Sequence, residues 1–419
     1  MLAAGAVVAA MGSFVAGLGV YQLVLALAAF RYRPSSGSGT PERRIAVLVP
    51  AHDEEASIAR CVGSLRDQEY PGELYEVIVI ADNCTDDTAA AARQAGAEVL
   101  VRDEPGARGK GRALRWAMDQ LLERTPPPDA IAVVDADSVV EPSFLAALVR
   151  PLEEGAGAAQ GESLLLDEGS GPAAFRAGAF LLVNRVRPAG RAALGLGCNL
   201  QGNGMLVSAG VLRANPWDAF SATEDLEYST KLLLAGVRTR FAGGAIVRSP
   251  AAPTSEAAKH QQLRWEGGKL HVARTQLGRL LGAALRRRDP ALFEAAVDLA
   301  VPPLGILAAA AAGGTLVCAV LAAFGVLPAW SVAPWALAFV AIPVYVLVGF
   351  RAARAPASAY RSLLQAPLFV LRKADGHAQS LIGSMSYVSD AMGHAVRSAR
   401  RELGALSRRG PRIRLSKTH

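Results

Sequence analysis

Two aspartates, Asp135 and Asp137, follow an apolar stretch at a spacing that suits metal binding. The sequence IAVVDADSVVEP (residues 131–142) predicts a buried strand whose last residues emerge at the edge of a sheet. Two positions apart in extended chain, both carboxylates leave on the same face. With no Lys or Arg between them, they suit a divalent cation that carries phosphate oxygens. The alternative is a strand that ends in a turn, where Asp is common.

Other polar stretches could supply further chemistry. They are acidic clusters, a Gly-rich basic loop and an Arg-Trp pair: PAHDEE (50–55), IADNCTDDT (80–88), ARGKGRAL (107–114), TEDLEYS (223–229) and QQLRW (261–265). Each also has an ordinary explanation. The acidic clusters could be helix starts, Lys110 a plain loop lysine, and Trp265 an interfacial anchor. His52, His260 and His271 lack metal-like spacing, so we interpret them as non-ligands.

Alternating strands and helices must position these residues. Strand patterns at RIAVLVP, YEVIVIADN and AEVLVR alternate with helix patterns, of which one opens in the RGKG loop. This order predicts an α/β fold with a largely parallel sheet. Ligands bind such sheets at the carboxyl ends of the strands, where residues 52–55, Asp82, Asp135 and Asp137 fall. Residues 151–215 show no clear elements, but QGNGMLVS within them predicts a tight backbone approach.

Two long uncharged blocks predict a membrane protein with a large soluble middle. Residues 1–30 and 299–350 contain no charged side chain, and each exceeds the roughly 20 apolar residues that cross a bilayer. The first block could be a secretory signal, since Ala26-Leu27-Ala28 resembles a cleavage site, but it lacks a basic start and favours a retained anchor. Prolines and tryptophans near residues 327–335 predict a turn between two spans.

Basic residues predict the orientation in the membrane. Basic residues follow the first span (Arg31, Arg33), precede the second (residues 286–288) and follow the third (Arg351, Arg354). The turn between the second and third spans has none. By the positive-inside rule, the middle and the C-terminus are cytoplasmic, so we expect a multi-pass protein of the inner (plasma) membrane. The four cysteines form no CxxC pair. The net charge of +7 is concentrated beside the spans and in the tail, which favours membrane lipids over nucleic acid.

The ordered set of motifs resembles the membrane-embedded family 2 glycosyltransferases, the group of cellulose, chitin and hyaluronan synthases. That group shares a GT-A fold and the pattern Asp, DxD, TED, QxxRW, and the resemblance covers roughly residues 43 to 290. It implies that Asp225 is the general base and that Asp137 binds the metal. It also implies a nucleotide-sugar site and an acceptor and diphosphate site. The nucleotide-sugar residues are Ala51, Glu54, Asp82, Lys110, Asp135 and Asp137. The acceptor and diphosphate residues are Glu224, Gln261, Arg264 and Trp265. PAHDEE departs from the group, with Asp53 where Asn is more usual.

The chemistry of these residues fits sugar transfer. Mg²⁺ or Mn²⁺ on Asp137 would neutralise a departing diphosphate, and Lys110 and Arg264 would help on the same oxygens. Asp225 would deprotonate the acceptor hydroxyl, and the helix dipole would keep it ionised. One base and no nucleophile predict single displacement with inversion at the anomeric carbon.

We therefore expect an inverting glycosyltransferase that uses a nucleotide sugar, UDP-linked, and a glycan or polysaccharide acceptor. The alternatives are a single transfer to a lipid acceptor, or an inactive scaffold that binds sugar nucleotides. A homo-oligomer or an export partner could complete a polymer channel. The expected segments are an anchor (1–30), a linker (31–42), the GT-A domain (43–258), amphipathic interface helices with QxxRW (259–298), two spans (299–350), and an interfacial segment with a basic tail (351–419).

Overall fold

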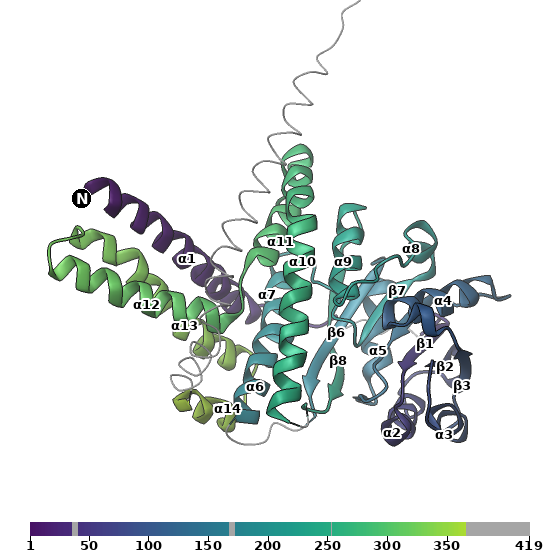
Figure 1. Cartoon of the computed structure of the whole chain (residues 1–419). Helices are drawn as coiled ribbons and strands as arrows, with labels where there is room; N and C mark the ends of the chain where they lie inside the picture. The colour runs from purple at the N-terminus through teal and green to yellow at the C-terminus, as the bar shows by residue number, and fades with distance from the viewer. Residues whose placement is uncertain (36–40, 167–171, 253, 366–419) are drawn as a thin grey trace, which may run out of the picture.

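The computed structural model describes residues 1–35, 41–166, 172–252 and 254–365, and within them one mixed sheet of eight strands forms the centre (Figure 1). The strand order is β3-β2-β1-β4-β7-β6-β8-β5. Pairs β3–β2, β2–β1, β1–β4 and β6–β8 are parallel, and the others are antiparallel. The strands are β1 (Ile45–Ala51), β2 (Tyr75–Asp82), β3 (Glu98–Arg102), β4 (Ala130–Val133), β5 (Val139–Val140), β6 (Ala158–Leu165), β7 (Met205–Ser208) and β8 (Thr239–Ser249). The predicted α/β fold with a mostly parallel sheet is confirmed.

Helices cover both faces of this sheet and extend away from it on one side. Those of the sheet domain are α2 (Glu55–Arg66), α3 (Thr88–Gln94), α4 (Lys110–Glu123), α5 (Phe144–Glu153), α8 (Ala209–Ala214) and α9 (Glu224–Leu234). Those beyond it are α1 (Leu2–Ala29), α6 (Pro172–Leu181), α7 (Arg187–Ala193), α10 (Ser255–Arg287), α11 (Pro290–Ala300), α12 (Leu304–Ala323), α13 (Ala333–Ala352) and α14 (Ala357–Ser362). A π-helical turn, Leu182–Val186, joins α6 to α7.

Alternate residues of the central strands enter two separate cores. Val47 and Val49 of β1 pack with α2 and α5, whereas Leu48 of the same strand packs with α4 and α9. This is the period of two that a strand imposes on its side chains. Because both faces are covered by helices, both sets of side chains are apolar, and the strand sequence is an almost unbroken apolar run.

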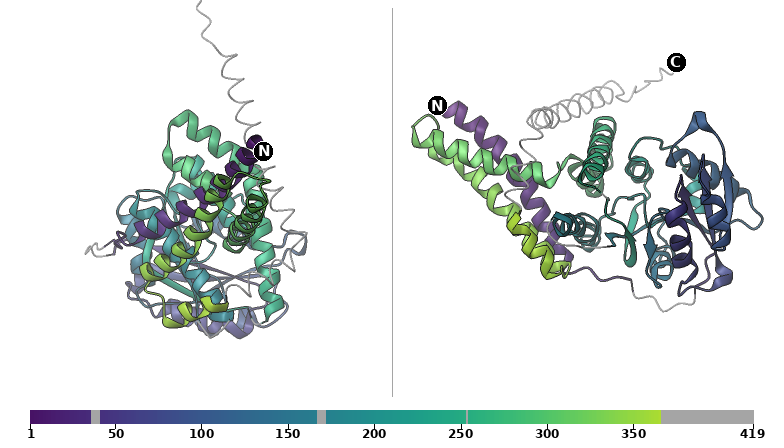
Figure 2. Two further views of the ribbon diagram at one scale, coloured as in Figure 1. Left: turned by 90° about the vertical axis from the view of Figure 1, so that its left-hand side faces the viewer. Right: turned by 60° about the horizontal axis from the view of Figure 1, so that its bottom comes forward.

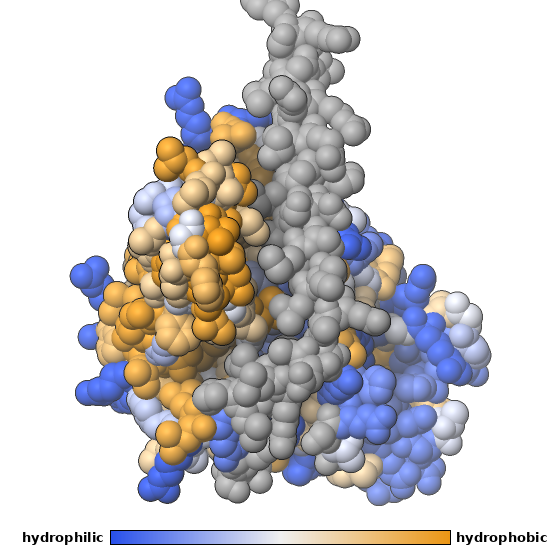
Figure 3. Space-filling view, turned by 60° about the vertical axis from the view of Figure 1, so that its left-hand side comes forward, coloured by the Kyte–Doolittle hydropathy of each residue, from blue (hydrophilic) through white to orange (hydrophobic). Residues whose placement is uncertain are grey.

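Three helices form a bundle that protrudes from the sheet domain (Figure 2). Among the described residues, Leu2–Ala29, Leu304–Ala323 and Ala329–Ala352 are long and apolar enough to cross a membrane, in agreement with the three predicted spans. Apolar residues gather over this bundle on the face shown in Figure 3. At the turn of this bundle Trp330 is exposed, whereas Trp335 is buried. That side chain is buried between α1 and α12, where its Nε1 donates to the Val8 carbonyl at 3.1 Å.

The long helix α10 lies between the bundle and the sheet domain (Figure 1). Thr254 caps the start of this helix, and its hydroxyl accepts a hydrogen bond from the Ala257 amide. The expected amphipathic pattern is present, but Leu277 and Leu280 pack with Leu292 of α11, so this part of the apolar face meets protein. The expected interfacial segment with a basic tail (351–419) lies outside the described residues from 366 on.

Candidate active site

A cavity of about 1660 Å³ opens at the carboxyl ends of the central strands. It brings together most of the predicted site residues: Glu54, Lys110, Asp135, Asp137, Glu224, Asp225, Gln261, Arg264 and Trp265. They come from five separate stretches of the chain. Ala51 and Asp82 do not line this cavity.

Asp135 and Asp137 lie in a turn and not in extended chain as predicted. Strand β4 ends at Val133, and the amide of Ser138 donates to the Asp135 carbonyl at 3.0 Å. Asn203 braces the turn: its Oδ1 accepts from the Asp135 amide at 3.1 Å, and its Nδ2 donates to the Ser138 hydroxyl at 2.9 Å. The turn keeps both carboxylates at the cavity wall, although by a different geometry from that of a strand.

Lys110 is the first residue of α4, and its side chain lines the cavity. Its Nζ donates to Asp135 Oδ1 at 2.5 Å and to the Gly202 carbonyl at 2.8 Å. Burial opposes the charge of the lysine, but the carboxylates of Asp135 and Glu224 outweigh it and raise the pKa of Lys110. The lysine is therefore a fixed cation in the middle of the acidic cluster.

Asp137 carries a negative charge that lacks a cationic partner. Burial, followed by the nearby charge of Asp135, raises the pKa of Asp137. Its Oδ1 accepts from the Ser138 hydroxyl at 3.0 Å, and no described residue forms an ion pair with its carboxylate. A half-buried carboxylate beside a second carboxylate is stabilised by a divalent cation, so the site fits Mg²⁺ or Mn²⁺.

Asp225 projects into the same cavity from the first turn of α9. Its Oδ1 accepts from the Leu226 amide at 2.8 Å. Desolvation, and then the charge of Glu224, raise the pKa of Asp225 to about 7. The expectation that the helix dipole keeps this group ionised is therefore corrected, because desolvation is the stronger influence. A carboxyl group with this pKa can take up a proton near neutral pH, as a general base must.

The QGNG segment passes between the base and the lysine. Gly202 has φ +75, and a Cβ on it would lie 3.2 Å from Asp225 Oδ2 and 3.3 Å from Lys110 Nζ. The tight backbone approach predicted from this segment is thus confirmed. It brings the Gly202 carbonyl within reach of Lys110 without a side chain that would fill the space.

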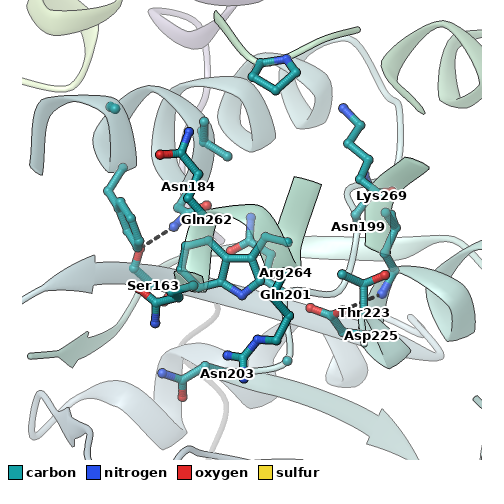
Figure 4. Close-up of a pocket in the computed structure, with 18 of the residues that line it drawn as sticks. Ser163, Asn184, Asn199, Gln201, Asn203, Thr223, Asp225, Gln262, Arg264 and Lys269 are labelled. Atoms are coloured by element: carbon teal, nitrogen blue, oxygen red, sulfur yellow. Dashed lines mark hydrogen bonds between the residues drawn. The ribbon is translucent and has the colours of Figure 1, made fainter. Parts of the chain in front are cut away.

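Helix α10 supplies the opposite wall with Gln261, Arg264 and Trp265. Arg264 and Trp265 are exposed toward the cavity, and the Trp265 ring lies 6.0 Å from that of Phe180 in α6. Figure 4 shows Arg264, Thr223 and Asp225 around the same space. The wall therefore places a cation and an aromatic ring opposite the acidic cluster.

Asp82 has a different environment from the other predicted carboxylates. Its Oδ1 accepts from Arg102 Nη1 at 2.6 Å in a buried ion pair. Both residues sit at the ends of paired strands, in register across β2 and β3. Ala51 is buried in the core beside Pro50, which does line the cavity.

The far end of the cavity is apolar and enters the helical bundle. Its walls there come from α12 and α13: Leu304, Ala308, Ala311, Ala312, Phe339, Ile342, Val346 and Leu347. Between this arm and the acidic cluster lie five polar residues: Arg187, Arg191, Asn199, Lys269 and Asp298. One continuous space therefore joins the strand ends to the candidate membrane helices.

The model of "Glycosyltransferase like family 2" matches residues 41–268 of this chain. The chain belongs to this family. The match covers both the acidic cluster and the Arg-Trp pair on α10, and it confirms the predicted family 2 glycosyltransferase.

Relatives of this glycosyltransferase include beta-monoglucosyldiacylglycerol synthases. That of a Synechocystis species is 29% identical over 55% of this chain and 49% of its own length. The synthase of a Nostoc species is 32% identical over 54% of this chain and 48% of its own length. The chain thus spans about half the length of these curated relatives. A mannosyltransferase from Pyrobaculum calidifontis, solved with GDP-Man and Mn²⁺, shares the fold with a TM-score of 0.51. It is 17% identical, and the likeness covers 95% of this chain and 99% of that one.

The structure adds cavity residues that the motifs of this glycosyltransferase did not reveal. Lys269 follows the QQLRW stretch by one helical turn. Arg187 and Arg191 are four positions apart in α7, within the residues 151–215 for which the sequence predicted no clear elements. The i, i+4 spacing of two arginines among apolar residues is the one signal that could have indicated them.

Proposed function

We propose that this glycosyltransferase moves a sugar from a nucleotide sugar to the hydroxyl group of a lipid acceptor, with inversion at the anomeric carbon. One observation carries the proposal: the cavity that holds Asp135, Asp137 and Asp225 continues into an apolar arm between α12 and α13. An apolar arm suits an acyl or prenyl chain, whereas a growing polysaccharide is polar along its whole length.

The residues divide between donor and acceptor. Lys110 and Arg264 stabilise the charge of the departing nucleoside diphosphate through charge-assisted hydrogen bonds. Asp225 takes the proton from the acceptor hydroxyl as the hydroxyl oxygen attacks the anomeric carbon and the bond to the diphosphate breaks. We assign one base and no nucleophile: Asp135 pairs with Lys110, Asp137 is the proposed metal ligand, and Asp298 pairs with two arginines. One displacement with inversion is therefore the simplest chemistry.

Asp137 would hold the divalent cation, with Asp135 beside it. The raised pKa of Asp137 and the lack of an ion pair to its carboxylate among the described residues support this choice. The cation, when bound, neutralises negative charge on the diphosphate. The Mn²⁺ and GDP-Man named for the Pyrobaculum mannosyltransferase support a metal and a nucleotide sugar here, although the nucleotide proposed for this chain is UDP.

A lipid acceptor replaces the polysaccharide acceptor as the first expectation. The apolar arm supports this change, and so do relatives whose name specifies a glucosylated diacylglycerol. The basic residues beside the spans support a cytoplasmic catalytic domain on the inner membrane. On this proposal the acceptor enters from the bilayer and the donor from the aqueous side.

The test is to incubate membranes that contain the protein with a panel of labelled nucleotide sugars and Mg²⁺ or Mn²⁺. The organic extract and the insoluble polymer are then counted separately. We expect label in the extract, at a single lipid-sized product, and none with Asp225→Asn. Label in polymer would favour the polysaccharide acceptor, and no incorporation from any donor would favour the sugar-nucleotide-binding scaffold.

A further inference from the structure

A cluster of charged side chains stands where the polar part of the cavity meets its apolar arm. Arg187 Nη2 donates to Asp298 Oδ1, and Arg191 Nη1 lies 3.2 Å from Asp298 Oδ2. Arg191 Nη2 also donates to Glu294 Oε2 at 2.8 Å, and Asn199 Nδ2 donates to Asp298 Oδ2 at 3.0 Å. Three helices, α7, α10 and α11, contribute the charges of this cluster, to which Lys269 also belongs.

The cations in the cluster outnumber the carboxylates. Lys269 Nζ donates to the carbonyl oxygens of Asp298 at 3.2 Å and Val301 at 2.7 Å, and no carboxylate among the described residues pairs with it. Three cations thus face two carboxylates. Of the two, Asp298 lines the cavity, whereas Glu294 lies behind the wall. The surface presented to the cavity is therefore positive.

Buried charges are normally paired, and this surplus charge is costly without a counterion. Desolvation, and then the charge of Arg187, lower the pKa of Lys269 to about 8, as expected for a lysine without a carboxylate partner. Donors are also in surplus, since the Nε atoms of Arg187 and Arg191 are buried without an acceptor among the described residues. An anion rich in acceptor oxygens would balance both the charge and the donors.

The position of the cluster indicates which molecule carries the anion. Lys269 and Asn199 lie on the same side of the cavity as Thr223 and Asp225 (Figure 4). On the other side of the cluster begins the apolar arm, where Leu304 follows closely after Val301. A molecule that reaches from the arm to Asp225 must pass its headgroup beside Lys269.

We propose that Lys269, with Arg187 and Arg191, binds the phosphate of an acceptor lipid that carries a phosphodiester between its apolar chains and its reactive hydroxyl. This inference rests on the proposed function and adds the class of the acceptor. The apolar chains lie between α12 and α13, the phosphate lies at Lys269, and the hydroxyl reaches Asp225. A neutral acceptor such as diacylglycerol leaves the surplus charge without a counterion.

The experiment measures binding and transfer with the full chain in detergent. Dihexanoyl phosphatidylglycerol, dihexanoylglycerol and inorganic phosphate serve as probes for wild type, Lys269→Gln, Lys269→Arg and the control Lys259→Gln. Lys259 lies on the same helix but is exposed and outside the cavity. We expect the phosphate lipid to bind tightest, and to bind about tenfold more weakly to Lys269→Gln, since charge-assisted hydrogen bonds are lost. Lys269→Arg and Lys259→Gln should bind it as wild type does.

Three binding results would overturn the inference. They are equal binding of the neutral and phosphate lipids, binding of inorganic phosphate alone, and an unchanged affinity in a Lys269→Gln protein that keeps its melting temperature. If Lys269→Gln does not fold, the inference is tested with the wild type alone. The two measurements are then its preference for the phosphate lipid over the neutral lipid and its binding of inorganic phosphate. Transfer to the neutral lipid with equal kcat/KM would contradict the inference but leave the proposed function intact. If the phosphate lipid binds through Lys269 and receives no sugar from any donor, the proposed function fails instead.

Discussion

The side chain of Thr223 fills the notch that Gly268 leaves in α10. A Cβ on Gly268 would lie 2.4 Å from Thr223 Cγ2 and 2.7 Å from Thr223 Oγ1. Thr223 precedes Asp225 by two residues, and Gly268 follows Arg264 by one helical turn. This contact therefore fixes how far the base on α9 stands from the cation on α10.

Gly268→Ala should lower kcat/KM because the added methyl group forces α10 away from α9. A displacement of about 1 Å in a catalytic site can cost on the order of 100-fold, so we expect a loss of roughly 10- to 100-fold. The control is Gly267→Ala, since a Cβ at that position meets nothing within 4 Å. Adding Thr223→Ala to Gly268→Ala removes the two closest atoms and should restore part of the activity. A Gly268→Ala enzyme as active as Gly267→Ala would contradict the positioning role.

The pH dependence should follow the ionisation of Asp225. Only the deprotonated carboxylate can act as the base, so kcat/KM should rise with pH through about 7 and then level off. The folded pKa is raised, so the desolvated carboxylate destabilises the protein above about pH 7, and this penalty disappears as the pH falls. A pH–rate profile measured with saturating metal checks the expected rise of kcat/KM. A midpoint near the ordinary value of 3.8 would be inconsistent with the desolvated base.

Lys110→Met should shift that profile toward higher pH as well as reduce the rate. The charge of Lys110 lowers the pKa of Asp225, so its removal leaves the base still more easily protonated. Lys110→Arg keeps the charge and is the matched control. The two variants should therefore differ in the midpoint of kcat/KM against pH, and equal midpoints would show that the lysine does not act on the base.

Chelation of divalent cations should stop transfer, and Mg²⁺ or Mn²⁺ should restore it. Asp137→Asn should raise the metal concentration needed for half-maximal activity, because it removes a negatively charged ligand. Asp119→Asn is a control acidic substitution, since Asp119 is exposed on α4, pairs with Arg115 and does not line the cavity. A chelator-resistant enzyme would rule out the metal role of Asp137.

The sequence predicted the sheet and the edge at which the acidic residues meet, because periodicity and strand ends are local properties. It did not predict that Asp82 pairs with Arg102, since that contact depends on the register of β2 with β3. It placed Asp135 and Asp137 in extended chain because a turn held by Asn203 involves a residue 68 positions away. The ionisation of Asp225 was misjudged for a similar reason: desolvation depends on what covers a residue in space.

The apolar arm of the cavity could not be predicted from the sequence either. Composition indicated that residues 299–350 cross a membrane, but it could not indicate that side chains of α12 and α13 leave a space joined to the catalytic cavity. The same holds for Lys269, which in the sequence is one basic residue among several on α10. Its significance comes from Arg187 and Asp298, which belong to other helices.

The most direct test of the account compares wild type with Asp225→Asn in two measurements on the same purified protein. One is the Kd for the nucleoside diphosphate, and the other is the rate at which labelled sugar enters the organic extract. We predict that the Kd changes less than about threefold while transfer falls by at least about 1,000-fold, as expected when only the base is lost. Lipid labelling by Asp225→Asn at the wild-type rate would contradict the account.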